Sequence, residues 1–341
     1  MKKFLSLILA TLMMTSVLAG CGGDTTDAPA EDDAQTEGEV PAGSEIADEL
    51  TFTTGGVSGT YYAFGAALAT EINKVTDSNV TAVEGKGSQG NIEMLDAEFA
   101  QLGFVQSDVM SYAYNGTNLF AETGKVEGFS TVAALYMEQV QIVTCNPEIK
   151  TVEDLRGKNV SVGTAGSGVY YNAVDVLGAY GMDIEKDINP QFLGFGESAE
   201  SLKDGKIDAA FVVAGAPTGA IPDLSTAKDT FLVSLDEEHV NALIEKSPYY
   251  SAYTIPADVY DLENDTTTVA VAAVVVARDD VSAADIFNVV SAIFENQEDI
   301  AANHAKGKEL NLEFGASITS VPYHPGAAEF FAMNGISVPT K

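Results

Sequence analysis

The stretch TTGGVSGTYYAFG (residues 53–65) places four glycines and several small hydroxyl side chains between a strand-like and a helix-like segment. Its centre, SGTYY, reappears as SGVYY at residues 167–171, 109 positions further along and again after a Gly/Thr-rich loop. Two more segment pairs keep nearly this offset: EGKG with LGFG, and LDAEFAQLGFV with LKDGKIDAAFV. Self-similarity at one offset indicates a repeated structural unit. We therefore predict two similar βαβαβ units in series.

Strand-like and helix-like segments alternate through the rest of the chain. Composition predicts strands at residues 50–53, 80–84, 100–106, 132–144, 159–163, 190–194, 209–214, 230–234 and 266–276. Such alternation favours parallel sheets with helices on both faces. The apolar run TTTVAVAAVVVA suits a central strand because it is shorter than the roughly 20 residues of a membrane-spanning helix. The two longest strands, 132–144 and 266–276, are the candidates for crossing between the two units.

The two glycine-rich loops predict a ligand site between the units. Glycines let the backbone approach a ligand, and the free amides of a helix N-terminus hold an anion without a charged side chain. The alternative is that each loop is only a tight turn, with tyrosines in the core. Neighbouring residues on a helix point about 100° apart, so we expect one tyrosine of each pair to be structural.

The N-terminal part of the chain has the features of an exported lipoprotein. MKKFLSLILATLMMTSVLAG (residues 1–20) has the layout of a signal peptide. The LAGC pattern that ends at Cys21 is typical of bacterial lipoproteins, whose first mature residue is an acylated cysteine. Residues 21–49 contain ten acidic and no basic residues, which predicts a disordered linker. We therefore expect an extracytoplasmic protein that is held on the cell membrane by its lipid.

Composition and motif spacing argue against nucleic-acid binding and catalysis. The formal net charge is −33, whereas nucleic-acid binding depends on basic residues that neutralise phosphates. His239, His304 and His324 have neither metal-binding spacing nor partners for a catalytic triad. GKGSQG (residues 85–90) matches a dinucleotide fingerprint, but it lies at the second strand-helix turn, not the first, and its repeat copy lacks the third glycine. We expect no enzyme activity, no cofactor and no metal site.

Several motifs resemble, in family order, the TAXI family of TRAP transporter solute receptors. They are residues 53–68, 87–109, 151–168, 208–221 and 251–260, and the resemblance covers essentially the whole mature folded chain. It implies an α/β, type II periplasmic-binding-protein fold with two pseudo-repeated lobes around a ligand cleft. It also implies that a monomer delivers glutamate, glutamine or a related small carboxylate to an ion-driven TRAP permease. The alternative is a ligand-sensing lipoprotein of the same fold that signals to a membrane partner.

The resemblance also predicts lobe boundaries and ligand contacts. Lobe 1 comprises residues 50–139 and 267–341, and lobe 2 comprises residues 140–266. The expected ligand-binding residues are Gly55, Gly56, Ser58, Gly59, Tyr61, Gln106 and Asp108 in lobe 1, and Thr164, Gly166, Ser167, Tyr170, Gly215, Pro217 and Thr218 in lobe 2. For Asp108, capping of the following helix is an equal alternative. The chain has only two arginines. Arg156 is expected to face solvent at a helix end, and Arg278 is expected to pair with the aspartates that follow it. Amides and hydroxyls are therefore expected to hold the ligand's carboxylate.

Overall fold

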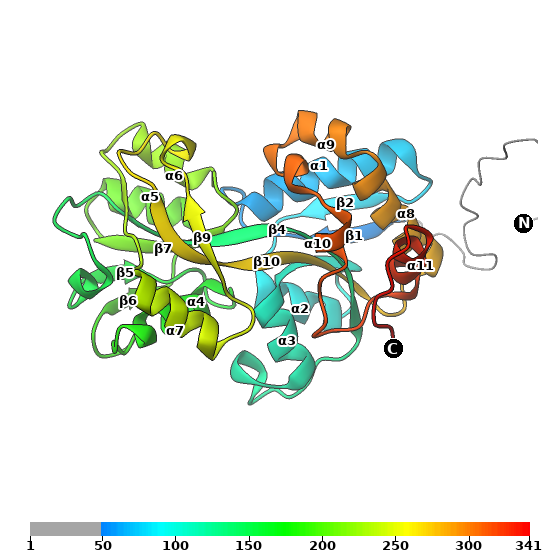
Figure 1. The fold of residues 1–341 in the computed structure, drawn as a ribbon, viewed down its shortest axis with the longest axis horizontal. Coiled ribbons are helices and arrows are strands. Elements are labelled where there is room, and N and C mark those ends of the chain that lie inside the picture. The colour runs from blue at the N-terminus through cyan, green and yellow to red at the C-terminus, as the bar shows by residue number, and fades with distance from the viewer. Residues whose placement is uncertain (1–48) are drawn as a thin grey trace, which may run out of the picture. The chain divides into compact units, whose positions relative to one another are not determined.

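The computed structural model describes residues 49–341 (Figure 1). The predicted signal peptide, the predicted acylation site Cys21 and almost all of the acidic linker lie outside these described residues. None of the helices within residues 49–341 has the length and hydrophobicity that a membrane span requires.

All nine predicted strands are present, and a tenth accompanies them. The strands are β1 (Leu50–Thr53), β2 (Val80–Val83), β3 (Leu102–Gln106), β4 (Phe129–Thr144), β5 (Asn159–Ser161), β6 (Asn189–Gln191), β7 (Ala209–Ala214), β8 (Phe231–Leu232), β9 (Ser251–Ile255) and β10 (Thr266–Arg278). Sequence analysis missed β9, which is short and largely exposed along its length. An edge strand of this kind lacks the buried apolar run that marked the others.

The strands form one sheet in the order β2-β1-β3-β10-β4-β7-β5-β6, with β8 paired to β4 and β9 to β10. The three strands at each end of this order are parallel to one another. The prediction of purely parallel sheets is wrong at the centre, where β10 runs antiparallel to both β3 and β4. The reason is that the chain crosses from one end of the sheet to the other along β4 and returns along β10 (Figure 1).

Eleven α-helices and four short 3₁₀ helices accompany this sheet in the described part of the chain. The α-helices are α1 (Thr60–Val75), α2 (Ser88–Asp96), α3 (Ser107–Asn115), α4 (Val169–Ala179), α5 (Phe195–Lys203), α6 (Ala220–Ser225), α7 (Glu237–Lys246), α8 (Ala283–Glu295), α9 (Gln297–Asn303), α10 (Leu312–Gly315) and α11 (Pro325–Met333). The 3₁₀ helices are η1 (Asn118–Phe120), η2 (Val152–Leu155), η3 (Ala257–Val259) and η4 (Ala305–Glu309).

The internal repeat corresponds to a repeat in the fold. β1-α1-β2-α2-β3 and β5-α4-β6-α5-β7 follow each other along the chain. Their strands have the same spatial orders, β2-β1-β3 and β6-β5-β7. In both units the first helix begins within the repeated motif, at Thr60 in SGTYY and at Val169 in SGVYY. The two units are therefore pseudo-repeated α/β lobes.

Separate hydrophobic cores stabilise the two lobes. One cluster of buried side chains draws on residues 50–136 and 272–331, and two others draw on residues 140–271. Along β4 the core changes between Tyr136 and Val140, and along β10 it changes between Val271 and Ala272. We propose lobe boundaries at these two changes of core, between Tyr136 and Val140 in β4 and between Val271 and Ala272 in β10.

Candidate functional site

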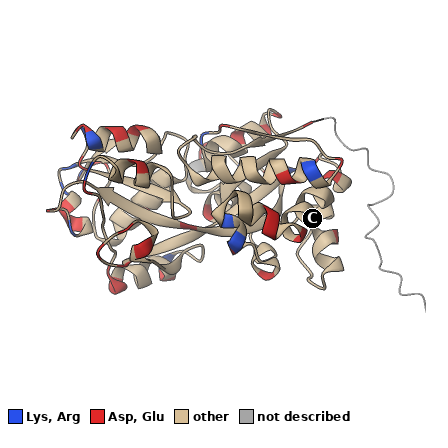
Figure 2. Ribbon diagram, turned by 90° about the horizontal axis from the view of Figure 1, so that it is seen from above, with Lys and Arg blue, Asp and Glu red and all other residues tan. Residues whose placement is uncertain are grey.

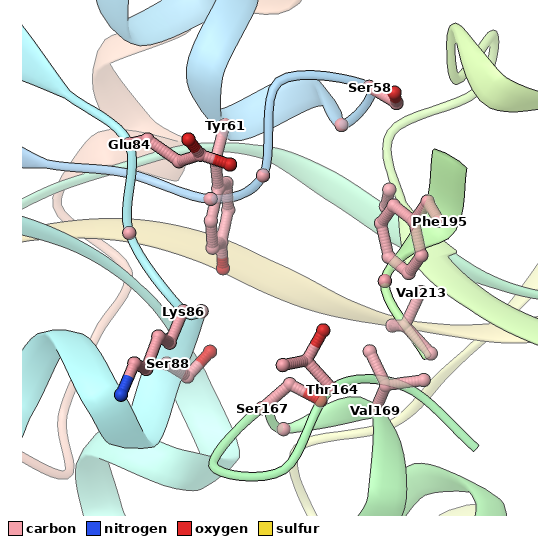
Figure 3. Close-up of a pocket in the computed structure, with 18 of the residues that line it drawn as sticks. Ser58, Tyr61, Glu84, Lys86, Ser88, Thr164, Ser167, Val169, Phe195 and Val213 are labelled. Atoms are coloured by element: carbon pink, nitrogen blue, oxygen red, sulfur yellow. The ribbon is translucent and has the colours of Figure 1, made fainter. Parts of the chain in front are cut away.

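A cavity of about 590 Å³ lies between the lobes and is lined by residues of both (Figure 3). This volume is within the range of small-molecule binding sites, roughly 300–1,000 Å³. Its walls are the loops that follow β1, β2, β5 and β6, which are the loops that lead into the helices of the repeat. These loops occupy equivalent positions in the two lobes, so the repeat places two matching pairs of loops around one space.

Four helices begin at this cavity. The lining residues at their starts are Gly59 for α1, Gly87 and Ser88 for α2, Gly168 and Val169 for α4, and Gly194 and Phe195 for α5. The first turn of a helix has amides without intrahelical partners, and its dipole carries partial positive charge there. Within the described part of the chain, no side chain caps α1, α2 or α4. The cavity therefore favours an anionic group.

The loop before α1 adds further free donors. Within residues 49–341, no acceptor receives a hydrogen bond from the amides of Gly56, Val57 or Ser58. Gly56, Val57 and Ser58 all line the cavity. The glycines thus expose backbone amides that donate to no acceptor among the described residues, and such amides are available to a ligand.

The middle of the cavity holds buried polar side chains. The Tyr61 hydroxyl points into the cavity and donates a 2.7 Å hydrogen bond to Glu138 Oε2 (Figure 3). Glu138 is 2% exposed, and this burial raises the pKa of its carboxyl to about 8. Burial likewise raises the pKa of the Tyr61 hydroxyl well above its ordinary value. Gln106 Oε1 and Ser167 Oγ are also buried, and neither has a hydrogen-bond partner among the described residues.

The rest of the lining consists of apolar side chains on the lobe 2 side and exposed charged side chains on the lobe 1 side. Phe195, Val169 and Val213 lie together on the lobe 2 side (Figure 3). Glu84 and Lys86 are exposed, and the Lys86 side chain runs away from the centre of the cavity in Figure 3. The site thus combines a polar part near Tyr61 with an apolar part near Phe195, which suits a small amphipathic solute.

Direct hydrogen bonds join the lobes beside the cavity. The Gly90 amide of lobe 1 donates to the Gly166 carbonyl of lobe 2 over 3.0 Å. The Thr60 hydroxyl donates to the Gly215 carbonyl over 2.9 Å. These contacts require the two lobes to be closed on each other, so the structure describes the closed arrangement.

The structure brings eight of the predicted site residues together around the cavity and places six elsewhere. Those that line it are Gly55, Gly56, Ser58, Gly59, Tyr61, Gln106, Thr164 and Ser167. Those that do not line it are Asp108, Gly166, Tyr170, Gly215, Pro217 and Thr218. Of the repeated tyrosines, Tyr61 is the one that faces the cavity, whereas the Tyr170 hydroxyl donates to Glu185 near the surface.

The six residues outside the cavity lining have structural contacts of their own. Asp108 is fully buried and accepts hydrogen bonds from the Val109 amide and from Asn172. The Thr218 amide donates to the Tyr260 hydroxyl, which fixes the loop after β7. Gly166 and Gly215 accept the interlobe bonds described above, and Pro217 lies between Gly215 and Thr218. These residues hold the lobes and loops together around the cavity.

Sequence analysis missed other residues that line the cavity. They include Glu84, Lys86, Ser88, Glu138, Gly168, Phe195 and Val213. A signal existed for several of them, because Glu84 and Phe195 belong to the EGKG and LGFG segments that share the repeat offset. Glu138 also had a signal, since it is a carboxylate within an otherwise nearly apolar strand.

The chain is similar to several solved structures, among them MatC, SsuA and an ancestral arginine-binding protein. MatC from Rhodopseudomonas palustris with bound malate is 15% identical, covers 77% of this chain and 90% of its own, and superposes with a TM-score of 0.55. The periplasmic aliphatic sulphonate binding protein SsuA from Escherichia coli is 16% identical, with coverages of 84% and 90% and a TM-score of 0.45. An ancestral arginine-binding protein bound to arginine is also 16% identical, with coverages of 77% and 99% and a TM-score of 0.49.

At 15% identity the likeness to MatC concerns the fold alone, which is the two-lobed, type II periplasmic-binding-protein fold. A sequence model of the NMT1-like family matches residues 52–335, which is most of the chain and includes both lobes. The protein therefore belongs to the NMT1-like family.

Proposed function

We propose that this protein is an extracytoplasmic solute receptor that captures a small carboxylate between its lobes and delivers it to a TRAP-type membrane permease. The observation that carries the proposal is the convergence of four helix N-termini, two from each lobe, on one cavity between the lobes. The resemblance to the TAXI receptors supports the transport role and makes glutamate, glutamine or a related organic acid the expected solute. The predicted acylation of Cys21 would keep the receptor beside the permease.

The charge distribution supports recognition of the carboxylate by local backbone groups. Neither arginine lines the cavity, since Arg156 pairs with Asp187 and Arg278 pairs with Asp280. Acidic residues are spread over both lobes (Figure 2), so the protein as a whole repels anions. A helix N-terminus contributes about 0.3–2 kcal/mol to binding an anion, depending on burial. Several acting together in a buried cavity can therefore replace a guanidinium group.

Calorimetric titration tests this proposal. The purified chain, freed of bound solute by unfolding and refolding, is titrated with amino acids, hydroxy acids, oxo acids and dicarboxylates. We expect saturable one-to-one binding of at least one small carboxylate. The carboxamide of the same compound should bind at least about tenfold more weakly, equivalent to about 1.4 kcal/mol, because it lacks the negative charge. Absence of saturable binding, or equal affinity for acid and carboxamide, would contradict the proposal.

A further inference from the structure

A chain of buried side chains crosses from lobe 1 to lobe 2 beside the cavity. Gln106 ends β3 in lobe 1, and its Nε2 donates a 3.0 Å hydrogen bond to Asn172 Oδ1 of α4 in lobe 2. Asn172 Nδ2 donates to Asp108 Oδ2 over 3.1 Å and to the Tyr250 hydroxyl over 2.9 Å. All four side chains are at most 3% exposed. Water therefore has little access to this chain.

The hydrogen-bond partners determine which way each amide is turned. An ionised carboxylate only accepts hydrogen bonds, so Asp108 requires the NH₂ group of Asn172. Burial raises the pKa of Asp108 to about 6, which leaves the carboxyl mainly ionised at neutral pH. The Tyr250 hydroxyl also requires the NH₂ group of Asn172, because it donates its own proton to Asp175 and can only accept a hydrogen bond from Asn172.

This orientation of Asn172 fixes Gln106 in turn. Asn172 Oδ1 faces Gln106 as an acceptor, so Gln106 must turn its NH₂ group toward lobe 2. Gln106 Oε1 is then left as a buried acceptor without a partner among the described residues. Because Gln106 and Asn172 belong to different lobes, this orientation is imposed when the lobes close.

The free oxygen lies beside the N-terminus of α4. A Cβ built on Gly168 would overlap Gln106 Oε1, so this oxygen lies against the residue that caps the N-terminus of α4. Gln106 and Gly168 both line the cavity. A solute whose carboxylate binds the helix N-termini would thus place its neighbouring carbon near a hydrogen-bond acceptor.

We infer that the solute carries an N–H or O–H donor beside its carboxylate and that this donor binds Gln106 Oε1, held as an acceptor by the positioning residues Asn172, Asp108 and Tyr250. This inference rests on the proposed function. It names the class as 2-amino or 2-hydroxy acids and disfavours 2-oxo acids. An oxo acid brings a second acceptor to Gln106 Oε1 and leaves both oxygens without a proton between them.

Matched sets of three acids that differ only at carbon 2 test the inference by calorimetry. The first set is glutamate, 2-hydroxyglutarate and 2-oxoglutarate; the second is leucine, 2-hydroxy-4-methylpentanoate and 4-methyl-2-oxopentanoate; the third is alanine, lactate and pyruvate. In each set that binds, we expect the amino or hydroxy member to bind at least about tenfold more tightly than the oxo member. Whichever of the amino acid and the hydroxy acid binds more tightly identifies the donor group of the natural solute as an ammonium or a hydroxyl.

Variants separate positioning from simple loss of packing. Asn172→Ala leaves Gln106 free to turn, so the preference over the oxo acid should fall to about threefold or less. In Gln106→Met, which has a side chain of similar shape but no amide oxygen, the preference for the amino or hydroxy acid over the oxo acid should also be lost. This variant provides the test if Asn172→Ala does not fold. Gln106→Glu keeps an acceptor and should keep the preference.

Each outcome of these titrations is decisive. An oxo acid that binds as tightly as its amino and hydroxy counterparts would overturn the inference while leaving the proposed receptor function intact. An undiminished preference in both Asn172→Ala and Gln106→Met would overturn the roles assigned to these side chains. Absence of binding by every acid in the three sets, and by the wider panel of carboxylates, would overturn the proposed function and the inference with it.

Discussion

Replacing Gly168 by alanine is expected to weaken solute binding at least about 100-fold, or about 2.7 kcal/mol. The added Cβ would overlap Gln106 Oε1 and stand 2.8 Å from Gln106 Cδ and 2.9 Å from Val109 Cγ2. Gly168 belongs to lobe 2, whereas Gln106 and Val109 belong to lobe 1, so the clash arises only when the lobes close. The backbone φ of Gly168 is −67°, which alanine adopts without strain.

Titration calorimetry and small-angle scattering together check this prediction. Gly168→Ala should remain folded, with a melting temperature in the absence of solute close to that of the unmodified protein, but should fail to become more compact on addition of solute. Gly178→Ala is the matched control, because it lies in the same helix and its added Cβ would meet no atom within 4 Å. Unmodified affinity in Gly168→Ala would show that solute binding does not require the closed arrangement.

Replacing Glu138 by glutamine is expected to raise the free energy of unfolding at about pH 9 by a few kcal/mol. Burial raises the pKa of Glu138 from 4.5 to about 8, and each pKa unit corresponds to about 1.4 kcal/mol. Between about pH 4.5 and 8 the folded protein keeps a proton that the unfolded chain has lost, so the unfolding free energy falls as pH rises through this range. Glutamine removes this loss and can still accept the hydrogen bond from Tyr61.

Urea-induced unfolding near pH 5 and near pH 9 measures the effect. The difference in unfolding free energy between Glu138→Gln and the unmodified protein should be small near pH 5 and reach its full size near pH 9. Asp108 also has a raised pKa, but it is present in both proteins and cancels in the comparison. Glu84→Gln removes an exposed carboxylate from the same cavity and serves as the control for loss of one negative charge. If Glu138→Gln changed the unfolding free energy by the same amount at both pH values, the prediction would be contradicted.

Much of the fold could be predicted because its signals are local or repeated. Buried strands such as β3 and β7 are short apolar runs, and the crossing strands β4 and β10 are longer ones. The SGTYY and SGVYY motifs identified the loops that now surround the cavity, because glycines and hydroxyls at a strand end have a limited set of physical uses. The antiparallel centre of the sheet could not be read from single segments, since it depends on how the chain crosses between lobes.

The detailed site could be predicted only in part, because its contacts join residues distant in sequence. Asp108 was expected either to contact the ligand or to cap α3, yet its partner is Asn172, which lies on the other lobe. Glu138 became part of the site through Tyr61, which precedes it by 77 residues. Neither pairing leaves a local pattern in the sequence, since both depend on closure of the lobes or on packing of α1 against β4.

The central claim is that a carboxylate binds at the convergence of four helix N-termini, and a crystal structure of the protein with the tightest-binding acid from the titrations tests it most directly. We predict that both carboxylate oxygens lie within hydrogen-bond distance of backbone amides at the starts of these helices and their preceding loops, including amides from both lobes. A solute whose carboxylate instead binds Lys86, or points out to solvent, would contradict the account.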